Sequence, residues 1–236
     1  MGGVMSLNAK RRKLLGGAAA VAGTAAIGAP GLLLAQSQPI RIGITNALSG
    51  PNALYGEPNV MGQRIAVNQV NKAGGILGRQ VELVVRDDRA QTAQGVAIAR
   101  ELAGSGVNFL MGGGSSAVAI AYCGLMPELK MLYFSNAAAA MAITHEAWNR
   151  NVFRLCPNAY SLYASLGRAV AERYPNVLKW GGITPDYSFG HDAARVFANA
   201  VRQYHPKRDS KDFEIRSTVV VGATQTDFRP QVNALM

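Results

Sequence analysis

From residue 40 onward the chain repeats one pattern: a short β-rich run, a turn rich in small residues, and a segment with helical periodicity. Strands are expected at residues 40–45, 81–85, 108–111 and 131–134, with helices between them. Strands that alternate with helices in this way form parallel sheets, and their right-handed crossovers place helices on both faces. The sequence therefore predicts an α/β fold with doubly wound parallel sheets.

The pattern restarts near residue 152, which predicts two lobes: lobe I at residues 38–151 and part of a lobe II at residues 152–236. The last expected helix keeps its apolar residues up to Met236 and has no terminating glycine or polar tail. We therefore expect the chain to be the N-terminal part of a longer protein, with the second lobe incomplete.

Two helices carry stripes of small and apolar residues at helical spacing. The first expected helix places Gly62, Ala66 and Val70 on one stripe. The clearest stripe belongs to a helix of lobe II and comprises Ala193, Val196, Phe197, Ala200, Val201 and Tyr204. These stripes predict the faces that pack against the sheets.

Residues 1–37 match an export signal. The basic block Lys10-Arg11-Arg12-Lys13 precedes an uncharged run at residues 14–35, and Ala35-Gln36-Ser37 supplies small residues for cleavage. Adjacent arginines before a weakly apolar, glycine-rich run resemble a twin-arginine signal, which predicts export to the periplasm in a folded state. A retained membrane anchor is the alternative, because the run is long enough to span a bilayer.

Charge and composition exclude several classes of protein. The formal net charge is +10, but residues 10–13 supply four of those charges, and the bases of residues 202–216 are interleaved with acids, so we expect no nucleic-acid partner. The three histidines are isolated, so we expect no metal site and no cofactor. Cys123 and Cys156 can form a disulfide or remain free thiols.

Residues 112–116, Gly-Gly-Gly-Ser-Ser, follow an expected strand and precede an expected helix. Backbone N–H groups at a helix start bind anions, and the helix dipole adds about 0.3–1 kcal/mol at an exposed site. A serine hydroxyl can also donate to a carboxylate, and glycines let a ligand approach the backbone. The pattern predicts a site for a small anion, and a tight strand-to-helix turn without a ligand is the alternative.

Two enzyme interpretations compete for the same residues. A dinucleotide site needs the third glycine of G-x-G-x-x-G, and Ala117 stands there. A serine hydrolase would use Ser115 or Ser116 with Asp186 and either His191 or His205, but both histidines lie in or near a helix of the other lobe. We therefore expect a binding protein rather than an enzyme.

Five motifs occur in order: Ile40-Arg41-Ile42-Gly43, Leu48-Ser49-Gly50-Pro51, Tyr55-Gly56, Asn71-Lys72-Ala73-Gly74-Gly75-Ile76-Leu77-Gly78 and Asp87-Asp88. The set resembles the periplasmic leucine/isoleucine/valine-binding type of substrate-binding protein of ABC transporters, across essentially all of residues 39–236. The resemblance implies the two-lobed type I periplasmic binding fold. Members of that family continue well past the position of Met236.

The resemblance also implies a ligand site between the lobes. Ser116 and the backbone of Ala137 would hold carboxylate and ammonium groups, with Ala139 standing where the family usually has a hydroxyl residue. Tyr55 would border the ligand from lobe I, and Phe189 would do so from lobe II, at a position that is commonly Tyr. Loss of both hydroxyls leaves two ligand classes open: branched-chain amino acids, and less polar aromatic or aliphatic carboxylates.

By the same resemblance, the protein would be a monomeric solute-binding component of an ABC importer. Its cleft would close on a small ligand by hinge motion, and the closed form would dock on a permease in the inner membrane. A ligand-sensing receptor module of the same fold is the alternative, and a retained N-terminal helix would favour it. Because the second lobe is expected to be incomplete, we expect residues 38–236 alone to gain less stability from a ligand than a longer form.

Overall fold

The computed structural model describes residues 38–50, 52–222 and 225–236. The predicted export signal, residues 1–37, lies outside these ranges. Among the helices in the described ranges, none is long and apolar enough to cross a bilayer. In chain order, the elements are β1 (Ile40–Asn46), α2 (Ala53–Lys72), β2 (Val81–Asp87), α3 (Thr92–Gly104), β3 (Phe109–Gly112), α4 (Ser116–Leu129), β4 (Leu132–Ser135), η1 (Met141–Thr144), β5 (Val152–Arg154), α5 (Ala159–Arg173), β6 (Lys179–Trp180), β7 (Ile183–Pro185), α6 (Ser188–Tyr204), β8 (Glu214–Ile215), β9 (Val219–Val221) and α7 (Arg229–Leu235).

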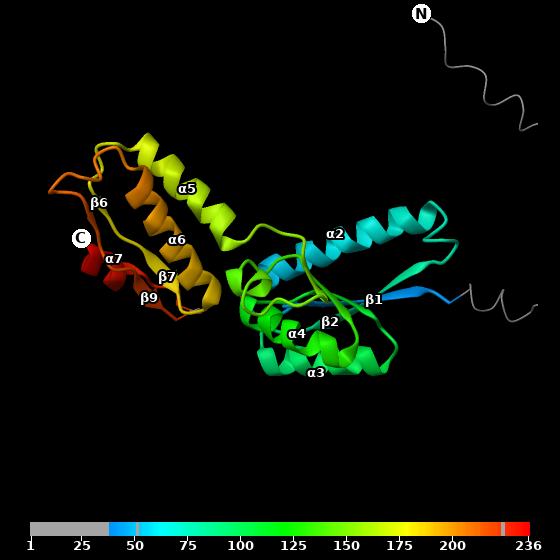
Figure 1. The fold of residues 1–236 in the computed structure, drawn as a ribbon. Coiled ribbons are helices and arrows are strands. Elements are labelled where there is room, and N and C mark those ends of the chain that lie inside the picture. The colour runs from blue at the N-terminus through cyan, green and yellow to red at the C-terminus, as the bar shows by residue number, and fades with distance from the viewer. Residues whose placement is uncertain (1–37, 51, 223–224) are drawn as a thin grey trace, which may run out of the picture. The chain divides into compact units, whose positions relative to one another are not determined.

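The first region is built on a five-stranded parallel sheet with strand order β2-β1-β3-β4-β5. In the register of the central strand, Ile42 lies opposite Leu83 on one side and Phe109 on the other. Figure 1 shows α2 on one face of this sheet, with α3 and α4 on the other. Because all five strands are parallel, their carboxyl ends meet at one edge, where ligands bind in open α/β sheets. The predicted α/β fold is confirmed.

The edge strand β5 changes one predicted boundary. The sequence placed the start of lobe II at residue 152, but Val152 pairs with Tyr133 and Arg154 pairs with Ser135, so β5 completes the first sheet. The restart of the pattern marked a real strand that belongs to the preceding sheet. The division of residues 38–236 into two lobes stays a prediction, with its boundary moved to the segment that follows Arg154.

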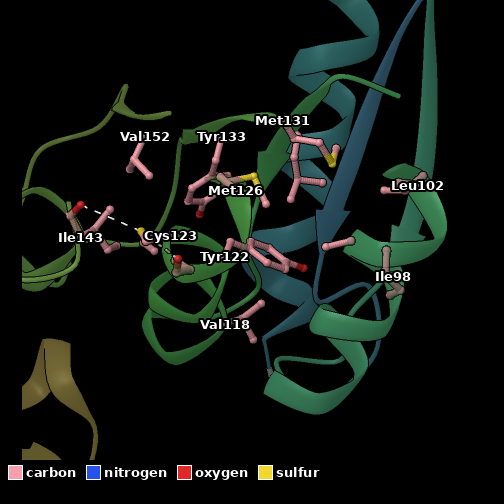
Figure 2. Packing of buried hydrophobic residues seen from close by; sticks show 14 of the residues in the cluster. Ile98, Leu102, Val118, Tyr122, Cys123, Met126, Met131, Tyr133, Ile143 and Val152 are labelled. Carbon is pink, nitrogen blue, oxygen red and sulfur yellow. Dashed lines mark hydrogen bonds between the residues drawn. The ribbon is translucent and has the colours of Figure 1, made fainter. Parts of the chain in front are cut away.

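The buried core of the first region lies between the sheet and helices α3 and α4 (Figure 2). Tyr122 and Tyr133 are fully buried and meet edge to face, with ring centroids 5.4 Å apart. Cys123 is buried beside them, and its thiol donates to the carbonyl of Ala119 at 3.2 Å. The sequence left open whether Cys123 and Cys156 form a disulfide or remain free thiols. In the structure both are free thiols.

Of the two predicted buried helix faces, the structure confirms one and contradicts the other. In α6, Ala193, Val196, Ala200 and Val201 are buried, which confirms the predicted inward face, and Tyr204 lies at its exposed margin. In α2 the predicted stripe is wrong: Gly62 and Ala66 are exposed, and the buried residues are Gly56 and Val60. The reason is a close backbone approach, since a Cβ on Gly56 would collide with the carbonyl of Ala47 and only glycine fits there.

The C-terminal region, residues 155–236, contains two parallel two-stranded sheets, β6-β8 and β7-β9. Helices α5 and α6 pack closely because Gly167 leaves room for Ala200, whose Cβ would lie 2.7 Å from a Cβ at residue 167. The α6 residue Asp192 joins the two regions, since its Oδ2 accepts the backbone N–H of Met141 at 2.8 Å. This contact ties the start of η1 to the second region.

Candidate functional site

The glycine loop, residues 112–116, leaves β3 at the carboxyl edge of the first sheet. Gly112 has φ 122° and lies against the carbonyl of Thr45, where any side chain would collide. The N–H of Gly113 donates to that same carbonyl at 2.7 Å, and the N–H of Gly114 donates to Oδ2 of Asp88 at 2.8 Å. Two of the loop's N–H groups therefore hold the loop itself, so the predicted anion site is limited to the N–H groups at the start of α4.

The two serines of the loop have different roles. Ser115 is the N-cap of α4, and its hydroxyl accepts the N–H of Val118 at 3.3 Å, which is a normal capping bond. Ser116 is the first residue of α4 and is only 3% exposed. Within the described residues, no hydrogen bond engages the Ser116 hydroxyl. The sequence placed the binding hydroxyl at Ser116, and the structure leaves that group available.

A buried carboxylate lies directly behind the glycine loop. Asp88 follows β2, is fully buried, and accepts N–H groups from Gly114 and, at 2.9 Å, from Ala90. Burial raises the pKa of Asp88, while the two backbone N–H groups and the neighbouring charge of Asp87 have smaller effects. The two carboxyl oxygens of Asp88 thus hold the loop, and their two bonds fix where the start of α4 points.

The alanine loop, residues 135–140, leaves the neighbouring strand β4 at the same edge. Ala137 is exposed, while Ala139 is half-buried and its carbonyl accepts the N–H of Ala159 at 2.8 Å. In the described residues, no backbone hydrogen bond engages Asn136 or Ala137. The backbone at Ala137, where the resemblance implies a ligand contact, is therefore unpaired, whereas Ala139 offers only a methyl group.

Helix α2 brings Tyr55 to both loops. Near its start, Asn52 Nδ2 donates to the Gly114 carbonyl at 3.3 Å, and one turn beyond Tyr55 the Asn59 Oδ1 accepts from Asn136 Nδ2 at 2.9 Å. Tyr55 lies between these two contacts and is 72% exposed. The structure thus brings the segments of Tyr55, Ser116 and Ala137 to one edge of the sheet, and their role in binding a ligand stays a prediction.

Phe189 approaches from the second region as part of an aromatic group. Its ring lies 5.8 Å from that of Tyr163 and 6.0 Å from that of Tyr187, and it also packs against the core of the first region. Burial raises the pKa of the Tyr187 hydroxyl, with added contributions from Tyr163 and Tyr55. The rings of Tyr163, Tyr187 and Phe189 therefore form one aromatic group, and Phe189 also contacts the core of the first region.

Sequence reasoning missed Tyr163 and Tyr187 as members of this group. Tyr187 belongs to no motif, although its position two residues before Phe189 offered a signal. Phe189 also lines a cavity of about 280 Å³ between α6 and the strands of the second region. The aromatic group therefore borders both the predicted cleft and this cavity.

The hydrolase interpretation finds no support in the hydrogen bonds. The exposed His191 pairs with Asp186 at 2.9 Å, and the buried His205 accepts the N–H of Lys207 through Nδ1 at 3.1 Å. Among the described residues, neither histidine bonds to Ser115 or Ser116, and no three metal-ligating side chains gather into a site. The Ser115 hydroxyl is already engaged as a helix cap.

Comparison with known proteins identifies the fold and the family. A family model described as periplasmic binding protein matches residues 39–236. The chain belongs to the periplasmic binding protein family. A Leu/Ile/Val-binding protein, BraC3 of Rhizobium johnstonii, is 38% identical over 117 residues, which are 50% of this chain and 32% of the relative. A leucine-, isoleucine-, valine-, threonine- and alanine-binding protein of Pseudomonas aeruginosa is 31% identical over 57% of this chain and 36% of its own length.

Solved structures show the same fold. A solute-binding protein of an ABC transporter from Rhodopseudomonas palustris, in complex with 3,4-dihydroxybenzoic acid, superposes with a TM-score of 0.68 at 22% identity, covering 83% of this chain and 51% of that one. LivJ of Streptococcus pneumoniae, in complex with isoleucine, gives a TM-score of 0.66 at 23% identity, covering 84% and 54%. The chain thus spans about half the length of these structures and about a third of the curated relatives.

Proposed function

We propose that this protein is the extracytoplasmic solute-binding component of an ABC importer, and that it binds a small carboxylate between its two lobes. The observation that carries the proposal is the start of α4, where the Ser116 hydroxyl and the adjoining N–H groups remain available at the carboxyl edge of the sheet. A helix start favours an anion, and a hydrogen bond to a charged group is worth about 1.5–3 kcal/mol. The family membership and the Leu/Ile/Val-binding relatives support the same function.

The expected class of ligand follows from the groups around the start of helix α4. Ala137 offers backbone atoms, while Ala139 offers a methyl group in place of a hydroxyl. Tyr55 and Phe189 supply aromatic surface from the two regions, and Tyr187 adds to it. We therefore expect a carboxylate with an apolar body, either a branched-chain amino acid or an aromatic or aliphatic acid.

The cellular setting completes the proposal. The protein is exported to the periplasm by the signal at residues 1–37, through the twin-arginine route, and acts as a monomer. Its lobes, residues 38–154 and the C-terminal region from residue 155, close on the ligand, and the closed form docks on an inner-membrane permease. No cofactor, metal or nucleic acid takes part, and no reaction is catalysed.

Calorimetric titration of the full product of the gene tests the ligand class. The titrants are L-leucine, L-isoleucine, benzoate and 3,4-dihydroxybenzoate, each paired with its amide, which keeps the shape but removes the charge. We expect at least one carboxylate to bind and its amide to bind much more weakly. Equal binding of an acid and its amide, or binding of none while a chromogenic ester is hydrolysed, would refute the proposal.

Two neighbouring serines supply matched variants for the same titration. Ser116→Ala removes the available hydroxyl, so affinity should fall about 10- to 100-fold, the equivalent of about 1.5–3 kcal/mol. Ser115→Ala removes only the helix cap, which should lower stability by about 0.5–2 kcal/mol while leaving affinity nearly unchanged. The opposite assignment, with affinity lost only in Ser115→Ala, would show that the wrong serine was chosen.

A further inference from the structure

The alanine loop is fixed at both of its ends, and in its middle the Asn136 side chain is bonded to Asn59 while the peptide groups have no backbone partner among the described residues. At the first end, the Ser135 carbonyl accepts the N–H of Leu155 at 2.8 Å. At the other end, the Ala138 carbonyl accepts from the Arg154 guanidinium at 2.8 Å. Between these anchors lie Asn136 and Ala137, whose peptide groups make no backbone hydrogen bond among the described residues. The loop therefore presents a short stretch of unpaired backbone on a fixed frame.

One side chain, Arg154, makes most of the hydrogen bonds that fix the far end of the alanine loop. Arg154 Nη1 donates to the Ala138 carbonyl, Nη2 donates to the Ala140 carbonyl at 2.5 Å, and Nε reaches Thr144 Oγ1 at 3.3 Å. The thiol of Cys156 adds a weak contact to the Ala138 carbonyl at 3.5 Å. A planar guanidinium can serve several acceptors in a fixed geometry, which the single ammonium of lysine cannot do.

The charge of Arg154 is not used in an ion pair, since none of the salt bridges within the described part of the chain includes it. Its donors go instead to backbone carbonyls and a hydroxyl of the segment from Ala138 to Thr144. The side chain is half-buried at the end of β5, where the chain leaves the first sheet. Arg154 thus stands between the ligand loop and the crossing into α5.

We propose that Arg154 is a positioning residue for ligand binding: by holding the Ala138 and Ala140 carbonyls, it sets the direction of the free backbone at Ala137. This inference rests on the proposed function, because the backbone at Ala137 is a ligand contact only if the site binds a small carboxylate. Arg154 does not touch the ligand, so its contribution comes from geometry rather than from its positive charge. The same bonds keep the loop aligned with the segment that leads into the second region.

Substitution of Arg154 separates geometry from charge. Arg154→Lys keeps the charge but lacks the planar fork that directs separate nitrogens to Ala138, Ala140 and Thr144, and Arg154→Met removes the donors and keeps much of the length. Both variants should bind L-isoleucine or 3,4-dihydroxybenzoate about 10- to 100-fold more weakly, because small displacements of a contact group are costly. Added methylguanidinium should restore part of the lost affinity in Arg154→Ala. Arg100→Lys, at an exposed pair with Glu128, is the matched control and should bind like the wild type.

Amide hydrogen exchange gives a readout that needs no ligand. In the unliganded Arg154→Met variant, peptides covering residues 136–141 should exchange faster than in the wild type, while those covering α3 should be unchanged. If the wild type binds neither probe but residues 136–141 exchange faster in Arg154→Met, the proposed function fails, while the role of Arg154 in holding the alanine loop stands. Unchanged loop exchange, or wild-type affinity in Arg154→Lys, would overturn the positioning role.

Discussion

Replacing Gly114 by alanine measures how tightly the glycine loop packs on the strand ends beneath it. A Cβ at residue 114 would collide with Oδ1 of Asp88 and would lie 2.7 Å from the backbone nitrogen of Ala47. Both neighbours are buried, at 0% and 1% exposure, so neither can move aside into solvent. The loop itself must shift, and the 2.8 Å bond from the Gly114 N–H to Asp88 must lengthen with it.

The expected cost combines two effects. Overpacking a well-packed site costs about 1–3 kcal/mol. Weakening a buried hydrogen bond to a carboxylate adds up to about 1.5–3 kcal/mol. We therefore expect Gly114→Ala to lower the free energy of unfolding by about 2–5 kcal/mol, measured by urea titration. For a chain of this size, the corresponding fall in Tm is at least about 4 °C.

Gly124→Ala is the matched control, because it makes the same chemical change within the following helix. Gly124 is exposed in α4, and a Cβ there would meet no atom within 4 Å. Alanine is the better helix former, so this variant should gain about 0.5–1 kcal/mol. If Gly114→Ala were as stable as the wild type, or if both variants changed in the same direction, the close packing of the loop on Asp88 would be refuted.

Three further predictions concern the core, the thiols and the pH dependence. Leu102→Ala, at a fully buried site, should lower the free energy of unfolding by about 2–5 kcal/mol, measured by urea titration. Leu77→Ala, at a 92% exposed site, should change it by no more than about 0.5 kcal/mol, and similar losses for the two variants would contradict the assigned core. Burial raises the pKa of Cys123 to about 11, so its thiol should resist iodoacetamide in the native protein and react after unfolding. Mass spectrometry measures the labelling, and rapid labelling of Cys123 in the native protein would contradict its burial. Burial also raises the pKa of Asp88 above its unfolded value of 3.8, so its contribution to stability is fully present below that pKa and is lost as the pH rises through the raised folded pKa. Asp88→Asn cannot titrate, so its free energy of unfolding should lack the decline that begins above the unfolded pKa, and a pH profile like that of the wild type would refute this role.

The fold could be predicted because its signals are local. Alternation of strands and helices follows from short-range patterning, and the stripe of α6 reflects burial on one side of one helix. The stripe of α2 failed because its buried face is set by the contact of Gly56 with the Ala47 carbonyl, which no periodicity reveals. Likewise, short-range patterning does not reveal that Gly181-Gly182 separate β6 from β7, which pair with different strands.

The candidate site could be predicted only where a motif carries it. The glycine loop drew attention to residues 112–116, since a strand, glycines and a helix start follow one another in the sequence, and the resemblance singled out Ser116 within it. Asp88 was noted in the sequence only as part of the Asp87-Asp88 motif, and Arg154 gave no signal. Each acts through contacts with a segment distant in the sequence: Asp88 with Gly114, and Arg154 with the alanine loop. Such contacts depend on the assembled sheet and cannot be read from spacing.

A crystal structure of the full gene product with its tightest-binding carboxylate tests the account most directly. We expect a carboxylate oxygen to lie about 2.7–3.1 Å from Ser116 Oγ or from a backbone nitrogen at the start of α4, with the apolar body of the compound near Tyr55 and Phe189. A carboxylate held by other residues, with no bond to Ser116 or to a backbone nitrogen at the start of α4, would contradict the account.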